Sequence, residues 1–400
     1  MIKAPKKIAF VCPRSGEGIV GGNEALVLGV AEKLHQQGQE VEILTTCARD
    51  HRTWDNFYPE QVDVVRGVTV RRFKVNDRDV GRWLSLEIQL SQGKALTTEE
   101  QLTWLEQGVN SFPLYEYLAS SLHRYDFVIC TPYLFPVSIW SAMIAGSKAV
   151  LLPCLHDESY AYLPIMRHLF RSVRGVIFNT AAERALAVRL YGTLPSGVVG
   201  MGISINDYPQ LIENGHQNYL LYLGRKETGK GLERLIDYFL ESKNFYISRG
   251  ISGWSDLNLF IVGGGDLSDL NRPDFLGRSD ICEFTALSEE EKRKMLSGAI
   301  ALVNPSRNES FSIVLMEAWR EGTPVLVDAR CEVTREHVEA SGGGLYFRDS
   351  REFGGVVNHL LSDMPLAEQM GMCGYNYVAS RYSWELVMDR WNKTINFFCN

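Results

Sequence analysis

The chain has 400 residues, of which 45% are hydrophobic and 22% charged, and its net charge is −7. This composition is that of an ordinary globular protein and excludes disordered and fibrous classes. The negative charge excludes nucleic acid as the main partner, because binding to its phosphates requires a basic surface. A chain of this length exceeds a single ordinary core, so we expect two domains.

The charge is unevenly distributed along the chain. Residues 1–205 hold 21 basic and 20 acidic residues, whereas residues 206–400 hold 20 basic and 28 acidic residues. The first half is therefore the half that we expect to meet an anionic surface.

Eight scattered cysteines, with no C-x-x-C pair, indicate free thiols in a reducing compartment. The apolar run after the N-terminal lysines, residues 8–12, is too short for the core of a signal peptide. No stretch approaches the roughly 20 apolar residues of a membrane span. We therefore expect a soluble, cytoplasmic protein, and leave open a peripheral contact with the inner membrane surface.

In the first half, short β-branched runs alternate with amphipathic segments. The predicted strands are residues 7–12, 41–46, 67–74, 126–130, 149–153 and 175–178. Helices are predicted at about residues 23–37 and 112–123, with a loop-and-helix insertion over residues 76–110. This alternation indicates a parallel sheet with helices on both faces.

The pattern lapses over residues 206–218, which we interpret as a linker. It resumes with predicted strands at 219–223, 257–262, 300–304 and 325–327. One predicted helix starts at residue 232, and another ends at residue 321. We expect an α/β protein of two Rossmann-like, doubly wound domains, residues 1–205 and 206–382, that face a cleft. A last helix, residues 383–400, should pack back on the first domain. In such sheets ligands bind at the carboxyl ends of the strands.

Two glycine-rich loops are similar to nucleotide-binding motifs of other protein classes. Gly16-x-Gly18-x-x-Gly21 follows the first strand, but Pro13, Arg14 and Ser15 intervene, and no acidic residue ends the second strand. A flexible loop is therefore favoured over the NAD site of a dehydrogenase. Residues 224–230 match a P-loop until position 231, where Gly replaces the hydroxyl that would bind magnesium. A loop that binds a diphosphate remains a good interpretation.

Asp77-Arg78-Asp79 matches the Asp-x-Asp motif by which some enzymes bind a metal ion. A three-residue match is frequent by chance, and a solvated loop accounts for it. We therefore predict no metal site.

The strongest local pattern is residues 304–324, NPSRNESFSIVLMEAWREGTP. Glu309 is expected just before a helix whose N-terminal amides belong to Ser310, Phe311, Ser312 and Ile313. Such amides and the helix dipole favour a phosphate. Glu317 lies a little over two turns further on, so both carboxylates could face one cleft.

With these motifs the chain resembles the family 4 retaining glycosyltransferases of GT-B fold, also described as group 1. The resemblance covers nearly the whole chain. Its marks are Glu309 and Glu317 with seven residues between them, the loop at 224–231, the pair Gly21-Gly22 with Glu24, and His156-Asp157. This family often has Gly where the chain has Ser310 and Ser312.

The resemblance implies a role for each matching residue. Arg225 and Lys230 would hold the donor diphosphate, Glu317 the ribose hydroxyls, and Glu309 the hydroxyls of the transferred sugar. The other implied contacts are Gly22 with the phosphate, His156 beside the donor sugar, and the turn at Gly264 beside the base, whereas Asp266 has no assigned role.

The resemblance implies transfer of a hexose from a nucleotide-diphosphate sugar to a carbohydrate or lipid-linked glycan, with a UDP-glucose-type donor favoured and a GDP-mannose-type donor possible. Fixed cations and helix amides can stabilise the leaving β-phosphate, so neither a metal nor a cofactor is expected. A nucleotide-sugar hydrolase, an epimerase-like protein and a non-catalytic nucleotide-binding protein remain alternatives. Arg167, Arg171 and Arg174 are predicted to form one basic helical stripe, either solvated or in contact with a lipid diphosphate.

Overall fold

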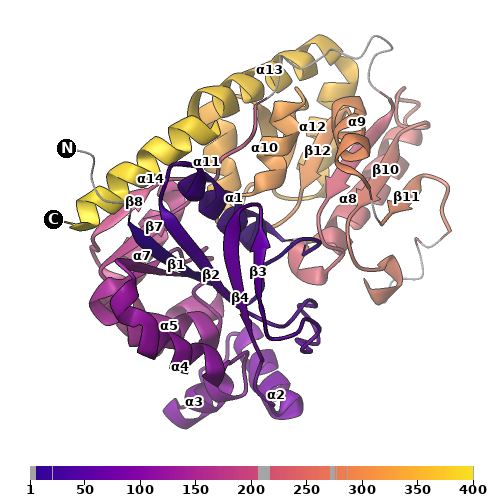
Figure 1. Ribbon diagram of the computed structural model, residues 1–400. Coiled ribbons are helices and arrows are strands. Elements are labelled where there is room, and N and C mark those ends of the chain that lie inside the picture. The colour runs from indigo at the N-terminus through magenta and orange to yellow at the C-terminus, as the bar shows by residue number, and fades with distance from the viewer. Residues whose placement is uncertain are drawn as a thin grey trace. The chain divides into compact units, whose positions relative to one another are not determined.

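The computed structural model describes residues 6–19, 21–205, 217–270, 275, 277–285 and 287–399. It divides into two compact units, Met1–Gly202 with Trp384–Asn400, and Ile203–Ser383 (Figure 1). Most of the predicted linker, residues 206–216, lies outside the described residues.

The first unit is built on an eight-stranded sheet in the order β3-β4-β2-β1-β5-β6-β7-β8. Its strands are parallel except for β3, which pairs with β4 in antiparallel orientation. The strands are β1 Lys7–Val11, β2 Glu40–Thr46, β3 Val62–Val65, β4 Val68–Phe73, β5 Phe127–Cys130, β6 Ala149–Leu151, β7 Gly175–Phe178 and β8 Ser196–Val198.

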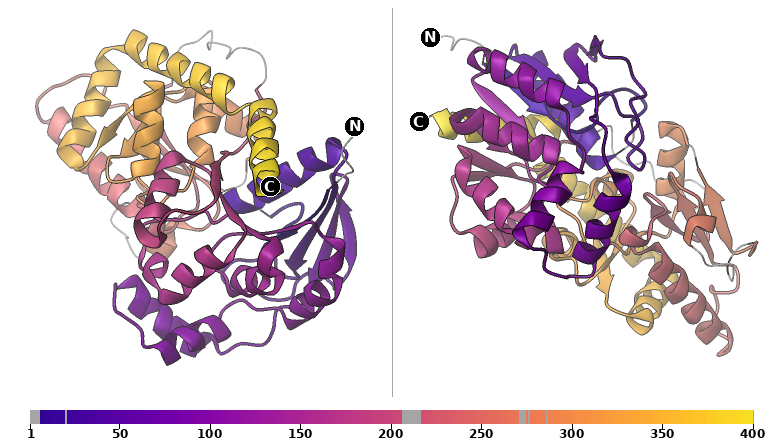
Figure 2. Two further views of the ribbon diagram at one scale, coloured as in Figure 1. Left: turned by 90° about the vertical axis from the view of Figure 1, so that its left-hand side faces the viewer. Right: turned by 90° about the horizontal axis from the view of Figure 1, so that it is seen from below.

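Helices lie on both faces of this sheet, as the two further views in Figure 2 show. They are α1 Gly22–Gln36, α2 Val80–Ser91, α3 Thr98–Glu106, α4 Phe112–Ser121, α5 Pro136–Ala145, α6 Pro164–Ser172, α7 Ala181–Tyr191 and α14 Trp384–Cys399. Helix α14 packs against α1 and β8. Because both faces are covered, β1 is buried after its first residue, which is why it reads as a continuous apolar run.

The second unit has a fully parallel six-stranded sheet in the order β11-β10-β9-β12-β13-β14. The strands are β9 Tyr219–Leu223, β10 Asn258–Val262, β11 Ile281–Phe284, β12 Ala301–Asn304, β13 Val325–Asp328 and β14 Gly344–Phe347. The helices are α8 Leu232–Ile247, α9 Glu289–Gly298, α10 Ile313–Arg320, α11 Glu332–Ser341, α12 Ser350–Ser362 and α13 Met364–Arg381. This is the 3-2-1-4-5-6 order of a Rossmann fold.

The predicted α/β class with parallel sheets is confirmed. Sequence analysis missed β3, β8, β11 and β14, which are strands of three or four residues that alternation alone does not reveal. Strands β3 and β4 are joined by Arg66 and Gly67 with φ of 50° and 82°, the geometry of a two-residue hairpin turn.

Candidate functional site

The strand order of the second unit reverses between β9 and β12, and the loops that follow these two strands carry the predicted donor motifs. Strands β9 and β12 are parallel neighbours, so residues 224–231 and 305–312 leave the sheet at the same edge. The chain then runs outward in opposite directions, which leaves room between the two loops for a ligand.

An ion pair connects these loops. Lys230 Nζ lies 2.9 Å from Glu309 Oε1, and the two side chains are 28% and 15% exposed. Arg225 is more open, at 44% exposure, and its Nη1 lies 3.2 Å from Glu227 Oε1. The structure thus brings Lys230 and Glu309 together, and each predicted cation already has a carboxylate partner.

The helix after Glu309 begins later than predicted. Helix α10 starts at Ile313, and Ser312 is its N-cap with a left-handed backbone, φ 68° and ψ 77°. Ser310 and Phe311 therefore belong to the preceding turn, and the first helical amides are those of Ile313 and Val314. The left-handed residue reverses the chain and prevents an earlier helical start. Asn304 Nδ2 donates to Ser312 Oγ at 2.8 Å and holds this turn.

The prediction for Phe311 concerned its backbone amide. Its side chain is 1% exposed and points into an aromatic cluster. Its ring packs edge-on against His337 and Tyr382, with centroids 5.3 and 5.0 Å away. Burial lowers the pKa of His337 to about 3, and His337 Nδ1 lies 2.9 Å from the Tyr377 hydroxyl. Only the backbone of Phe311 is left to contact a ligand, and the cluster fixes where that backbone lies.

Glu317 lies on α10 and has a partner that sequence analysis missed. Lys292 Nζ of α9 is 2.9 Å from Glu317 Oε1. Burial lowers the pKa of Lys292, but the carboxylates of Glu317 and Glu289 outweigh it and raise the pKa overall. The signal for α9 was the capping box of Ser288 and Glu291, whose reciprocal bonds are 3.2 and 2.8 Å long.

The glycine turn at 263–265 packs against the loop after β9. A Cβ on Gly263 would lie 2.0 Å from the carbonyl oxygen of Gly224, so this position requires glycine. The space beside Gly264, the residue predicted near the base, is open, and its carbonyl accepts from the Lys226 amide at 2.9 Å. Asp266 now has a role, since its Oδ1 accepts from the amide and hydroxyl of Ser268.

Lys226 was not singled out from the sequence, although it holds these two loops together. Its side chain is fully buried, and Nζ lies 2.6 Å from Glu283 Oε1 on β11 and 3.3 Å from the Gly265 carbonyl oxygen. A buried lysine requires such partners. Sequence alone gave no signal, because the lysine sits in a polar loop.

In the first unit, His156 follows β6 and lies beside Glu158 rather than beside Asp157. His156 Nδ1 is 3.5 Å from Glu158 Oε1, and the same oxygen accepts from the buried Tyr133 hydroxyl at 3.0 Å. Asp157 instead faces outward and pairs with Arg189 at 2.8 Å and Tyr162 at 2.7 Å. His156 therefore has Glu158 as its carboxylate partner, whereas Asp157, its neighbour in the sequence motif, pairs with Arg189.

Glu183, which sequence analysis also missed, holds the backbone of the loop that carries His156. Its carboxylate accepts from the amides of Leu155 and Asn179, both at 2.6 Å, and so joins the loops after β6 and β7. Burial raises the pKa of Glu183 to about 8, in opposition to these amides. His156 therefore extends from a loop with a fixed backbone.

The loop after β1 ends at Gly22, the first residue of α1, and the space beside Gly22 is open. Glu24 forms an ion pair with Arg14 at 2.5 Å, both side chains being nearly buried. Arg14 also stacks over Trp54, 5.5 Å from its ring centroid. The Arg14–Glu24 ion pair supports the loop that ends at Gly22, which accounts for the glutamate that follows the Gly21-Gly22 pair.

Two features of uncertain meaning in the sequence now have structural explanations. Asp79 is the N-cap of α2 and accepts from the Arg82 amide at 2.9 Å. The arginine stripe is shorter than predicted, because α6 ends at Ser172. Arg174 lies beyond it and donates to the Phe398 carbonyl, which leaves Arg167 and Arg171 exposed on the helix.

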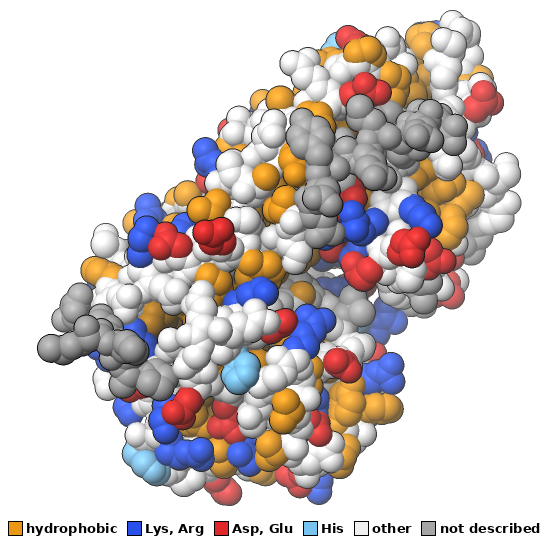
Figure 3. All heavy atoms as spheres, turned by 45° about the horizontal axis from the view of Figure 1, so that its top comes forward, with side chains coloured by type: hydrophobic (Ala, Val, Ile, Leu, Met, Phe, Trp, Pro, Cys, Tyr) orange, Lys and Arg blue, Asp and Glu red, His pale blue; other side chains and the backbone are white. Residues whose placement is uncertain are grey.

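On the face in Figure 3, basic side chains are interspersed with acidic and apolar ones, and the coloured residues form no broad basic band. All eight cysteines are free thiols. None of the helices in the described ranges combines the length and apolar character that a membrane crossing needs.

Known proteins share sequence with most of this chain. Residues 205–377 match the family described as glycosyl transferases group 1. A D-inositol 3-phosphate glycosyltransferase of Frankia alni is 30% identical over 347 residues, 78% of this chain and 79% of that protein. A phosphatidyl-myo-inositol mannosyltransferase of Propionibacterium freudenreichii is 25% identical over 330 residues, 80% and 76% of the two chains.

Solved structures share the fold at low sequence identity. The sucrose-phosphate synthase of Thermosynechococcus elongatus has a TM-score of 0.71 at 17% identity and covers 98% of both chains. Anabaena HepE, solved with UDP and glucose, has a TM-score of 0.69 at 15% identity and covers 98% of this chain and 99% of its own.

Proposed function

This chain belongs to the group 1 glycosyltransferases of GT-B fold, and we propose that it moves a hexose from a nucleotide-diphosphate sugar to a carbohydrate or lipid-linked glycan. The second unit would bind the donor and the first unit the acceptor. The transfer would retain the anomeric configuration and need no metal ion.

The observation that carries the donor site is the Lys230–Glu309 pair at the point where the strand order reverses. A cation for phosphate and a carboxylate for sugar hydroxyls lie together there, beside the N-terminus of α10. A nucleotide-diphosphate sugar is a ligand that needs both kinds of group next to each other. When it binds, its phosphates would replace Glu309 as the ion-pair partner of Lys230. The Glu309 carboxylate could then accept hydrogen bonds from the sugar hydroxyls.

Departure of the nucleotide diphosphate builds negative charge on the β-phosphate. Arg225, Lys230 and the amides of Ile313 and Val314 can stabilise that charge where it develops. Arg225, which is exposed beside its partner Glu227, can offer its bidentate fork to phosphate oxygens. These groups supply the positive charge that a metal would otherwise provide.

For the acceptor step we propose that the leaving phosphate itself helps to remove the proton of the acceptor hydroxyl, on the same face of the sugar. His156, held by Glu158, would contact the donor sugar. No residue of the chain is then required as a covalent nucleophile.

The relatives support the choice of ligands. HepE was solved with UDP and glucose, which favours a UDP-glucose-type donor, whereas the mannosyltransferase name keeps a GDP-mannose-type donor as the second choice. The names of the relatives refer to inositol phosphate and phosphatidylinositol. A lipid-linked acceptor would suit the exposed arginines Arg167 and Arg171 of α6.

A thermal-shift panel tests this proposal. We expect UDP-glucose or GDP-mannose, with the matching nucleoside diphosphate, to raise the Tm at millimolar concentration, because a ligand that binds the native state stabilises it. NADH is the control and should leave the Tm unchanged. Incubation of the stabilising donor with candidate acceptors should then release nucleoside diphosphate with a new glycoside, and release of free sugar alone would indicate a hydrolase.

A further inference from the structure

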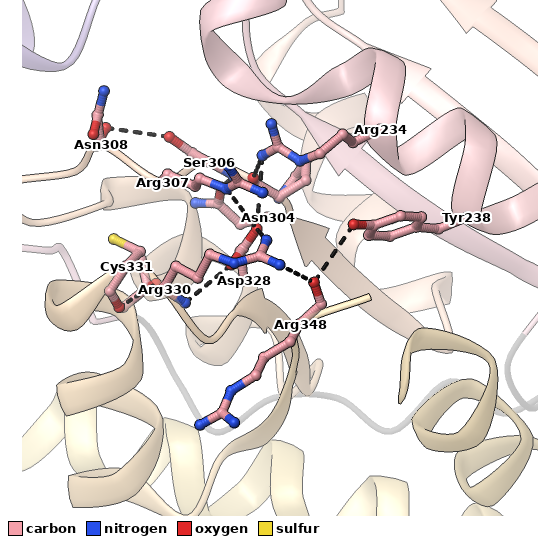
Figure 4. A network of polar contacts seen from close by, with 12 residues as sticks. Arg234, Tyr238, Asn304, Ser306, Arg307, Asn308, Asp328, Arg330, Cys331 and Arg348 are labelled. Carbon is pink, nitrogen blue, oxygen red and sulfur yellow. Dashed lines mark hydrogen bonds and ion pairs between the residues drawn. The ribbon is translucent and has the colours of Figure 1, made fainter. Parts of the chain in front are cut away.

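Three arginines from different parts of the second unit converge on one buried carboxylate at the end of β13 (Figure 4). Asp328 Oδ2 lies 3.2 Å from Arg307 Nε, 3.4 Å from Arg330 Nη1 and 3.6 Å from Arg234 Nη2. Arg234 comes from the first turn of α8, Arg307 from the loop after β12, and Arg330 from the loop after β13.

The charges in this cluster do not balance. Among the described residues, Asp328 is the only carboxylate that forms an ion pair with any of the three guanidinium groups. Its side chain is 1% exposed, whereas the arginine side chains are 33–43% exposed. The cluster therefore keeps an excess of two positive charges on its open side.

The surroundings of Arg234 disfavour its positive charge. Burial, and then repulsion from Arg307, lower the pKa of Arg234, and its Nε is buried with no hydrogen-bond partner. Like charges held this close repel one another. An anion bound over the arginines would remove this repulsion.

Other hydrogen bonds hold the cluster in place. Arg234 Nη2 donates to the Pro305 carbonyl oxygen at 2.8 Å, and Arg330 Nη2 donates to the Arg348 carbonyl oxygen at 2.7 Å. The Arg330 amide donates to Asp328 Oδ1 at 2.9 Å. A ligand would therefore meet arginines that are already positioned, which lowers the entropic cost of binding.

We propose that Arg234, Arg307 and Arg330 form a binding site for a phosphate monoester. A phosphate dianion matches the excess of two charges, and guanidinium groups bind phosphate oxygens in a bidentate manner. The site lies at the carboxyl ends of β12 and β13, the sheet edge at which ligands bind in this fold. Its carboxylate is Asp328, whereas Arg225 and Lys230 pair with Glu227 and Glu309.

This inference goes beyond the proposed transfer reaction and does not rest on it. The same phosphate chemistry could belong to a phosphorylated sugar or to free inorganic phosphate, so both are probes. Isothermal titration with inorganic phosphate and with glucose 6-phosphate, at ionic strength matched with chloride, measures them on the full chain. Binding of glucose 6-phosphate at least as tight as that of inorganic phosphate would support the monoester, and binding of inorganic phosphate alone would identify free phosphate as the occupant and overturn the monoester assignment.

The variants Arg307→Gln and Arg330→Gln should each weaken binding of the tighter probe by about tenfold or more, because a charge-assisted contact is lost. Arg348→Gln is the matched control, since Figure 4 shows that its side chain points away from Asp328 and only its carbonyl takes part. Far-UV circular dichroism and the Tm without ligand check that each variant folds. Wild-type affinity for both probes in Arg307→Gln and Arg330→Gln, or no binding of either by the wild type, would overturn the proposal.

A second comparison separates this site from the donor site. Nucleoside diphosphate binding should weaken in Arg225→Gln and remain at the wild-type level in Arg307→Gln. If Arg307→Gln weakens nucleoside diphosphate binding as much as Arg225→Gln does, the cluster is part of the donor site and the separate site is refuted. Loss of phosphate binding in Arg307→Gln with intact nucleoside diphosphate binding supports it, whatever the transferred sugar proves to be.

Discussion

Lys230 and Glu309 lie 79 positions apart in the sequence, yet Lys230 Nζ and Glu309 Oε1 are 2.9 Å apart. Each residue belongs to a loop that follows one of two adjacent parallel strands, β9 and β12. The ion pair therefore holds the residue proposed to bind phosphate, Lys230, next to the residue proposed to bind the sugar, Glu309, before any ligand binds. This leads to a prediction that distinguishes the two roles.

Glu309→Gln should lower the transfer rate by about 10²–10³-fold, as expected for the loss of one positioned polar group. Binding of the nucleoside diphosphate should not weaken, because Lys230 loses its competing carboxylate and keeps its charge. Transfer assays and calorimetric titration measure the two effects. The matched control is Glu290→Gln, at an exposed ion pair with Lys294 on α9, which should change neither. Weakened nucleotide binding at an unchanged rate would refute the assignment.

Glu158 should act through His156. We expect Glu158→Gln to lower kcat/KM by roughly tenfold, from the loss of one charge-assisted contact. In a His156→Ala background the same substitution should have little further effect, which a double-mutant cycle measures. Asp157→Asn is the control, since that carboxylate pairs with Arg189 and Tyr162 at the surface. Independent, additive effects of the two substitutions would contradict the coupling.

The left-handed backbone of Ser312 predicts which of two substitutions at this position destabilises the protein more. Its Cβ is unfavourable at φ 68°, at a cost of about 1–2 kcal/mol, whereas its Oγ satisfies the buried Asn304 amide. Ser312→Ala keeps the unfavourable backbone and loses the hydrogen bond, which costs about 1–3 kcal/mol. Ser312→Gly loses the bond but relieves the backbone. Urea unfolding should therefore rank Ser312→Ala below Ser312→Gly, and both below the wild type if the hydrogen bond outweighs the backbone cost. The reverse order of the two variants would show that the left-handed backbone carries no such cost, and a Ser312→Ala variant as stable as the wild type would show that the hydroxyl does not hold the turn.

His337 gives a pH dependence with a definite sign. Burial lowers its pKa from 6.5 to about 3. Between these two pH values the unfolded state therefore binds a proton that the folded state does not bind. The stability it contributes is fully present above pH 6.5 and is lost as the pH falls towards 3, by about 1.4 kcal/mol per pH unit for one proton. His337→Phe should lack this component. Urea titrations at several pH values give the difference between wild type and variant, and a difference independent of pH would contradict the assignment.

Sequence analysis predicted the features that local patterns encode. Strand β9, the start of α8 and the loops of the donor motifs follow from apolar runs and from glycines, and the parallel class follows from their alternation. The pairing of Lys230 with Glu309 could not be derived from spacing, since it depends on which strands become neighbours.

The partners that position the site could not be predicted, because they are long-range contacts. Lys292 reaches Glu317 from another helix, and Glu183 holds the loop before His156 from a position 28 residues away from Leu155. The early start predicted for α10 was wrong, because the sequence does not reveal that Ser312 adopts a left-handed backbone. The sequence also does not reveal that Glu158 lies beside His156 while Asp157 faces outward, since Tyr133 and Arg189 set the direction of each side chain.

The central claim is that Arg225 and Lys230 bind the donor diphosphate without a metal. Calorimetric titration of UDP or GDP into the wild type, Arg225→Gln and Lys230→Gln, each in EDTA and again with added magnesium, tests it most directly. Arg249→Gln, at the opposite end of α8, is the matched control. The account predicts equal wild-type affinity with and without magnesium, and a loss of about 1.5–3 kcal/mol in Arg225→Gln and Lys230→Gln but not in the control. A wild type that binds only with magnesium, or variants at Arg225 and Lys230 that bind as tightly as the wild type, would contradict it.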